Sequence, residues 1–177
     1  DTKAHYVQSI HYNNDELWVG TVHSGLIRIS DPNGKATIRT YSQETSDLSS
    51  DFVSALFEGI DRKLWIGTSG GGINILDLET EKITWILKGD QNLSSNTIQG
   101  ITEDNNNDIW VSFKSGIAKL DDTGVFINYS EDDGFENLVF NPNGVGKSGD
   151  TLYFGSAAGY NVFKPADLTF QQLPAKI

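Results

Sequence analysis

The stretch KLWIGTSGGGINILD, residues 63–77, places a tryptophan between aliphatic residues and follows it with a glycine run and a second apolar segment. Three other stretches repeat this order: ELWVGTVHSGLIRIS (16–30), DIWVSFKSGIAKLD (108–121) and TLYFGSAAGYNVFK (151–164). Their aromatic anchors, Trp18, Trp65, Trp110 and Tyr153, lie 43 to 47 residues apart. A period of this length indicates a repeat architecture.

Each repeat has the strand content of one propeller blade. In the second repeat, residues 52–58, 64–68, 72–77 and 82–87 are expected to form four strands, joined by polar or glycine-rich turns. No window of helical length has a sustained 3.6-residue apolar period. The sequence therefore predicts an all-β fold of four four-stranded antiparallel blades. We expect a single partial β-propeller domain, with blades at about 1–45, 46–90, 91–133 and 134–177.

The blades are expected to stack, because one blade cannot bury both of its faces. The four aromatic anchors should fill the layers between blades. Two residues after each anchor comes a small residue that would let adjacent sheets approach closely. These small residues are Gly20, Gly67, Ser112 and Gly155.

The glycine run at 70–72 has two interpretations, a phosphate cradle or a turn between strands. A phosphate loop needs a helix after the glycines and usually a lysine, whereas a strand is expected here, so we favour the turn. Residues 104–108, DNNND, resemble the start of a calcium loop. Ile109 and Ser115 stand where that loop needs glycine and glutamate, so a hairpin turn is favoured there too.

Composition excludes several functions. The net charge of −11 disfavours nucleic acid as a partner, because phosphates require lysine and arginine. The chain has no cysteine and therefore no thiolate nucleophile or cysteine metal site. Its three histidines, His23 among them, form no zinc or catalytic-triad spacing. We expect no catalytic residues, no metal and no cofactor.

The pattern LWIGT-x-x-GGI-x-x-LD, preceded by LSS-x-x-V, resembles the two-component regulator propeller repeat. This repeat builds the periplasmic sensor regions of Bacteroides-type hybrid two-component systems. The resemblance implies the last four blades of a seven-bladed propeller, with residues 168–177 leading to an Ig-like domain. It also implies a non-enzymatic sensor fragment that contributes to oligosaccharide sensing, with a histidine kinase elsewhere in the parent protein.

The loops before the inner strands and between the second and third strands should share one end of the propeller, the usual binding mouth. Candidate ligand-binding residues in these loops are His23, Ser69, Asn96, Lys114, Phe135, Glu136 and Asn137. Aromatic rings beside amides and carboxylates suit sugars. Phe135 could equally anchor its long loop in the core.

Two other functions stay open at this point: a propeller lyase or hydrolase acting on glycans, and a dimerisation scaffold that binds no ligand. Four blades would leave two sheet faces uncovered unless the ring closes. Such faces favour association. We therefore expect a homodimer or other self-association, or pairing with the remaining blades of the parent chain.

Overall fold

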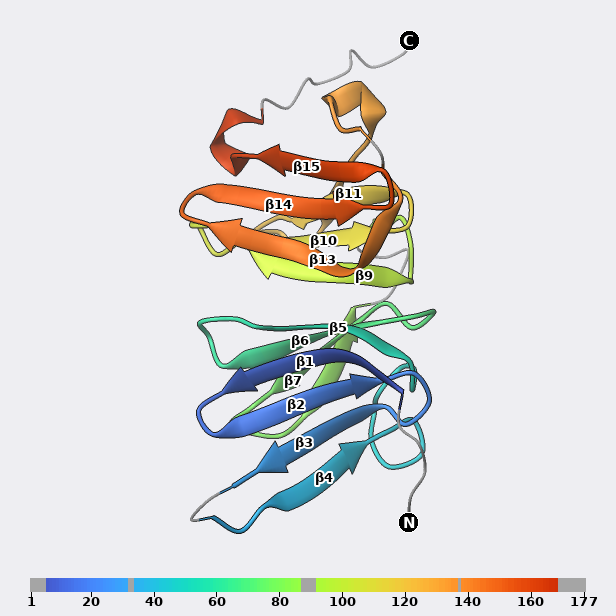
Figure 1. The fold of residues 1–177 in the computed structure, drawn as a ribbon, viewed down its shortest axis with the longest axis vertical. Helices are drawn as coiled ribbons and strands as arrows, with labels where there is room; N and C mark the ends of the chain where they lie inside the picture. The colour runs from blue at the N-terminus through green and yellow to red at the C-terminus, as the bar shows by residue number, and fades with distance from the viewer. Residues whose placement is uncertain (1–5, 32–33, 87–91, 137, 169–177) are drawn as a thin grey trace.

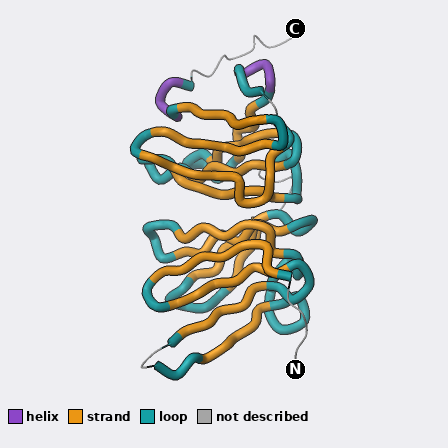
Figure 2. The backbone as a smooth tube through the Cα atoms, in the orientation of Figure 1, coloured by secondary structure: helices purple, strands orange, loops and turns teal. Residues whose placement is uncertain are grey.

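A computed structural model of the chain describes residues 6–31, 34–86, 92–136 and 138–168. Fifteen strands form four antiparallel sheets, each in sequence order from the inner strand outward (Figure 1). The prediction of an all-β propeller with four blades is confirmed. Figure 2 shows strands joined by short loops, with two short 3₁₀ turns, η1 (Glu131–Asp133) and η2 (Pro165–Asp167).

We number the sheets as blades 1 to 4. Blade 1 consists of β1 (Val7–Asn13), β2 (Glu16–Thr21), β3 (Leu26–Ser30) and β4 (Thr37–Tyr41). Blade 2 consists of β5 (Val53–Glu58), β6 (Lys63–Thr68), β7 (Ile73–Asp77) and β8 (Ile83–Ile86). Blade 3 consists of β9 (Ile98–Glu103), β10 (Ile109–Phe113), β11 (Gly116–Leu120) and β12 (Phe126–Tyr129).

Blade 4 has three described strands, β13 (Phe140–Ser148), β14 (Thr151–Ser156) and β15 (Gly159–Phe163). The expected final strand within residues 168–177 lies almost wholly outside the described residues. Within the described ranges, no helix is long and apolar enough to cross a membrane.

Three of the four aromatic anchors lie between blades, as predicted. Trp18, Trp65 and Trp110 are 1%, 8% and 1% exposed, and each packs against aliphatic or aromatic residues of the following blade. Tyr153 is 41% exposed, so the prediction that it fills an inter-blade layer is wrong. The reason is that no described blade follows blade 4 and covers this face.

The inner strands β1, β5, β9 and β13 lie about the middle of the molecule (Figure 1). They line an axial hollow of about 400 Å³, whose wall includes Gln8, Leu56, Ile101 and Asn143. The Asn143 side-chain amide donates to the backbone oxygen of Gln8 at 2.7 Å, which links the inner strands of blades 4 and 1.

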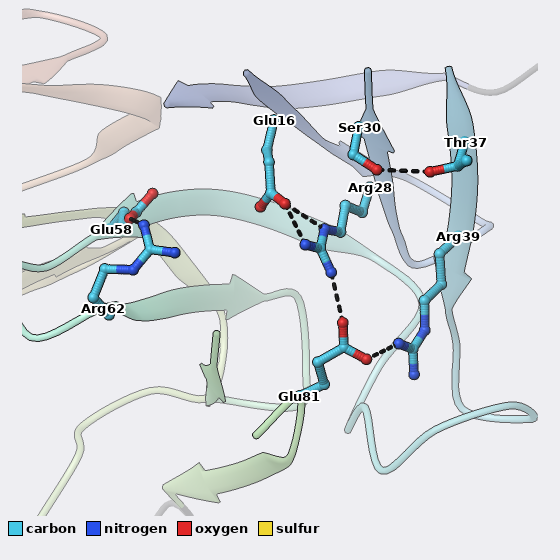
Figure 3. A network of polar contacts seen from close by, with 8 residues as sticks. All are labelled: Glu16, Arg28, Ser30, Thr37, Arg39, Glu58, Arg62 and Glu81. Atoms are coloured by element: carbon cyan, nitrogen blue, oxygen red, sulfur yellow. Dashed lines mark hydrogen bonds and ion pairs between the residues drawn. The ribbon is translucent and has the colours of Figure 1, made fainter. Parts of the chain in front are cut away.

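Ion pairs at the outer edge join blade 1 to blade 2 (Figure 3). The Arg28 guanidinium lies over the Trp18 ring, 5.3 Å from its centroid, and is paired with Glu16. It also reaches Glu81 of blade 2 at 2.7 Å, and Glu81 is paired with Arg39 as well. Two guanidinium donors lower the pKa of Glu81, Arg39 more than Arg28, so the carboxylate stays ionised at neutral pH.

Candidate functional site

The loops predicted to share one end of the propeller do so, and hydrogen bonds between blades hold them there. The Gly25 amide, in the turn between β2 and β3, donates to the Asp51 oxygen in the loop before β5 (2.9 Å). The Gly70 and Gly72 amides, between β6 and β7, donate to the Asn96 oxygen before β9 at 2.9 and 2.8 Å. The turns of blades 1 and 2 therefore each support the loop of the following blade, and these loops form a belt at one end of the propeller.

The glycine run is a strand turn, as favoured from the sequence. Gly70 and Gly72 have φ of 91° and 73°, a region that glycine adopts readily. A β-strand, β7, follows at once, and the amides of the run are engaged by Asn96 of the next blade. The amides are thus structural donors between blades.

The belt encloses a hollow of about 420 Å³ where blades 2, 3 and 4 meet. Its polar lining consists of hydroxyl groups, one amide and one ammonium: Ser54, Ser69, Ser95, Thr97, Gln99 and Lys114. Its apolar lining consists of Phe52, Ile98 and Pro142. No carboxylate lines the hollow among the described residues, although the chain as a whole carries a net charge of −11.

The structure brings three of the candidate residues together. Ser69 and Lys114 line the hollow directly, and an isolated bridge joins Ser69 to Thr97 of the next blade. Asn96 stands between two lining residues, and its backbone oxygen holds the turn of blade 2. The sequence placed these three at one end because Ser69 and Lys114 lie in equivalent hairpin turns and Asn96 lies in the loop before an inner strand.

The other candidates lie elsewhere. His23 is exposed on blade 1, where its ring meets Tyr6 edge-on at 6.4 Å. Glu136 is exposed, and its backbone is held by the Asn161 side chain at 3.0 and 2.6 Å. Phe135 is 4% exposed in the core between blades 3 and 4, and Asn137 lies outside the described residues.

Phe52, Thr97 and Pro142 were not among the candidates. Phe52 and Thr97 have equivalent positions, each being the residue just before an inner strand. Their shared position in the repeat could have identified both residues from the sequence, because the last residue of the loop before an inner strand borders the binding mouth. Pro142 lies inside β13, whose register with β14 shifts between Phe140 and Val145, and no regular strand pattern would place it at the hollow.

The DNNND segment forms a hairpin turn between β9 and β10. The Asp104 carboxylate is 4% exposed and accepts the amides of Asn106 and Asp108 at 2.8 and 3.1 Å. Its other oxygen accepts the Trp110 indole N–H at 3.0 Å. The described residues contain no group of three or more His, Cys, Asp or Glu arranged to hold a metal.

A histidine and a carboxylate do meet, but away from the hollow. His11 Nε2 lies 3.1 Å from Glu58 Oε2, near the far ends of β1 and β5, and Arg62 approaches the other Glu58 oxygen at 3.3 Å. The Glu58 side chain is only 6% exposed. This contact joins blades 1 and 2 and offers a substrate little access.

The fold and the repeat define the class of this protein as a β-propeller built of sequence-related blades. Residues 47–70 and 92–114 match the family model of the two component regulator propeller. The chain therefore carries two-component regulator propeller repeats, as the resemblance implied. Both matched segments combine the loop before an inner strand, that strand and the anchor strand after it.

A curated relative is much longer than this chain. A relative in Formosa agariphila, named Histidine kinase P4, is 27% identical over 208 residues, which cover 89% of the chain and 15% of the relative. The chain thus spans about a seventh of the curated relative that it matches.

Solved structures share the fold. The extracellular domain described as that of hybrid two component system BT3049 of B. thetaiotaomicron is 24% identical, with a TM-score of 0.56, over 90% of this chain and 28% of that one. The extracellular domain of BT4673 gives 19% identity and a TM-score of 0.74 over 97% and 26%. The computationally designed Ika4 protein gives 12% and 0.65 over 93% and 94%.

Proposed function

We propose that this chain is a blade segment of the extracytoplasmic, periplasmic sensor region of a two-component regulator. Its regulator propeller repeats and the names of its relatives support this role: a histidine kinase and two extracellular domains. In such a protein the segment would receive a signal, and the kinase would lie elsewhere in the parent chain.

We further propose that the signal is an oligosaccharide held at the loop end of blades 2 to 4. The observation that carries this proposal is the hollow of about 420 Å³ lined by four hydroxyl groups, the Gln99 amide and Lys114. Hydroxyl and amide side chains can donate to and accept from sugar hydroxyls, while Phe52, Ile98 and Pro142 offer surface to the apolar faces of sugar rings.

Isothermal titration calorimetry of the chain against neutral and uronate-containing oligosaccharides tests this proposal. We expect heat from at least one sugar. A ligand that carries a carboxylate should lose roughly tenfold in affinity when Lys114→Ala removes a charged hydrogen bond. Ser69→Ala should weaken a neutral sugar by a smaller factor.

The matched control is Lys35→Ala, which removes an exposed lysine of blade 1 that does not line the hollow. Its affinity should equal that of the unaltered chain. Oligosaccharide binding at this hollow is refuted if no sugar gives heat, or if Lys35→Ala and Lys114→Ala have the same effect on an acidic one.

A further inference from the structure

One buried amide in the hollow at the loop end of blades 2 to 4 has no partner in the described part of the protein. Gln99 is 5% exposed and lines this hollow. Its side-chain amide forms no hydrogen bond with any described residue. Buried polar side chains almost always have a hydrogen-bond partner, because leaving one unpaired costs free energy. An unpaired amide in the wall of a hollow therefore indicates a group that bonds with a molecule inside it.

The equivalent residue of blade 2 has the partners that Gln99 lacks. Gln99 is the second residue of β9, where the register with β10 shifts, and Ser54 has the same place in β5. The Ser54 hydroxyl donates to the backbone oxygens of Ile98 at 2.6 Å and of Gly67 at 3.1 Å, so blades 2 and 3 satisfy it. Pro142 of blade 4 lines the hollow as well, but a proline has no N–H to offer the Gln99 oxygen.

The hollow also holds an unpaired positive charge. Lys114 lines it and forms no ion pair or hydrogen bond with any described residue. Lys63, Lys119 and Lys164, in contrast, are each paired with an aspartate. In a chain with a net charge of −11, an ammonium group without a counter-ion makes this hollow a favourable place for an anionic ligand.

The free polar groups of the hollow are better at donating hydrogen bonds than at accepting them. The Lys114 ammonium can only donate, and the amide nitrogen of Gln99 also donates. The Ser69 and Thr97 hydroxyls form no side-chain hydrogen bond with described residues, and each can donate or accept. A carboxylate or sulfate complements these donors, because its charged oxygens accept hydrogen bonds that are roughly twice as strong as neutral ones.

We propose that the ligand of this hollow is an acidic saccharide, and that Lys114 and Gln99 together bind its carboxylate or sulfate group. This inference rests on the proposed function and narrows the class of sugar. The ammonium pairs with the anionic group, and the Gln99 amide donates a further hydrogen bond to it. Phe52 and Ile98 contact the apolar face of the sugar ring. Gln99 thereby becomes a residue that determines specificity, although it was not among the candidates from the sequence.

Calorimetry with matched pairs of oligosaccharides tests this proposal. Each acidic oligosaccharide, prepared from galacturonan, alginate or a sulfated galactan, is compared with its own neutral form, made by methyl esterification or by desulfation. We expect the acidic form of at least one pair to bind at least about tenfold more tightly than its neutral form. Its affinity should fall as salt is added, because salt screens the attraction. The pairs also show whether the anionic group is a carboxylate or a sulfate.

Two substitutions test the roles of the two residues. Lys114→Gln should lower the affinity for the acidic form by about tenfold, leave the affinity for the neutral form nearly unchanged, and reduce the dependence on salt. Gln99→Leu should lower the affinity for the acidic form by about fivefold. Because Gln99→Leu removes an unpaired buried amide, it should not lower the melting temperature, and this separates a loss of binding from a loss of folding.

Gln8→Leu and Lys35→Gln are the matched controls. Gln8 has the place of Gln99 in blade 1 but does not line this hollow. Lys35 is an exposed lysine that does not line it either, and Lys35→Gln changes the net charge as Lys114→Gln does. Neither control should change the affinity for the acidic or the neutral form.

The proposal is overturned if every neutral form that binds does so as tightly as its acidic form. It is also overturned if Lys114→Gln or Gln99→Leu leaves the affinity for the acidic form unchanged. Oligosaccharide binding at the hollow would still stand after either result, so the two proposals can fail separately. If no oligosaccharide of either kind gives heat, both proposals fail.

Discussion

Replacing Gly67 by alanine should destabilise the packing between blades 2 and 3. Gly67 lies in β6 two residues after the Trp65 anchor, and an added Cβ would be 2.8 Å from Ile98 Cγ2 and 3.0 Å from Ile98 Cβ. Ile98 is fully buried, and the Ala55 Cβ, at 3.1 Å, blocks the other direction. The φ of Gly67 is not positive, so the whole penalty comes from contact between the sheets.

Overpacking of this kind costs about 1–3 kcal/mol. In a chain of this length, a loss of 2 kcal/mol lowers the melting temperature by roughly 4–8 °C. Gly155→Ala is the matched comparison, because Gly155 has the same place in blade 4 but its Cβ would make only ordinary contacts, at 3.5 and 3.8 Å. We expect its stability to change by less than about 0.5 kcal/mol.

Urea unfolding followed by tryptophan fluorescence measures the difference. The midpoint should fall for Gly67→Ala and stay within error for Gly155→Ala, with similar slopes. Equal midpoints for the two variants would show that contact between sheets at this position does not limit stability.

Two further substitutions probe the core and its pH dependence. Trp110→Ala should lower the free energy of unfolding, measured in urea, by about 3–5 kcal/mol. It empties the layer between blades 3 and 4 and removes the indole donor to Asp104. Tyr153→Ala, at the exposed equivalent position, should lower it by less than about 1 kcal/mol. Burial raises the pKa of Glu103, an effect that Lys147 opposes and Asp61 and Asp104 reinforce. Folding therefore favours the protonated form, and the stability from this group, complete at low pH, is lost as pH rises through the raised pKa. Glu103→Gln should raise the melting temperature relative to the unaltered chain at pH 7, and this difference should vanish below about pH 4. A difference that is the same at all pH values would contradict a raised pKa of Glu103 as its cause.

The blade core could be predicted because the anchor and its neighbours recur in sequence. Trp18, Trp65 and Trp110 were identified by spacing alone and all lie between sheets. Tyr153 shows the limit of that reasoning. Repetition locates a residue on a strand face, but its burial depends on whether another sheet covers that face, and the strand itself carries no signal of its neighbour.

The candidate site was predictable to the extent that it is made of hairpin turns. Ser69 and Lys114 have corresponding places in successive blades, so the repeat brings them to one end. Phe135 belongs to a loop with no counterpart in the other blades. It packs against Tyr129 and Phe163, 5.6 and 5.1 Å between ring centroids, and these contacts could not be inferred from local sequence.

The position two residues after the anchor shows how the repeat tolerates a departure. In blades 1 and 2, Gly20 and Gly67 pair across strands with Ser9 and Ala55. In blade 3 the order is reversed, because Ser112 pairs with Gly100. A Cβ at Gly100 would lie 2.3 Å from Val145 Cγ1 of blade 4, so glycine is required on the inner strand there.

What the repeat preserves is therefore the small combined volume of a cross-strand pair, with one member always glycine. Either strand can supply the glycine, since both members face the next blade at the point of closest approach. Ser112 in β10 replaces the glycine found there in the other blades, and Gly100 on the neighbouring strand β9 compensates for this replacement. Exchanging the two residues in blade 2, as Ala55→Gly with Gly67→Ala, should recover part of the stability lost in Gly67→Ala alone. Urea midpoints of the single and double variants measure this coupling, and strict additivity would refute it.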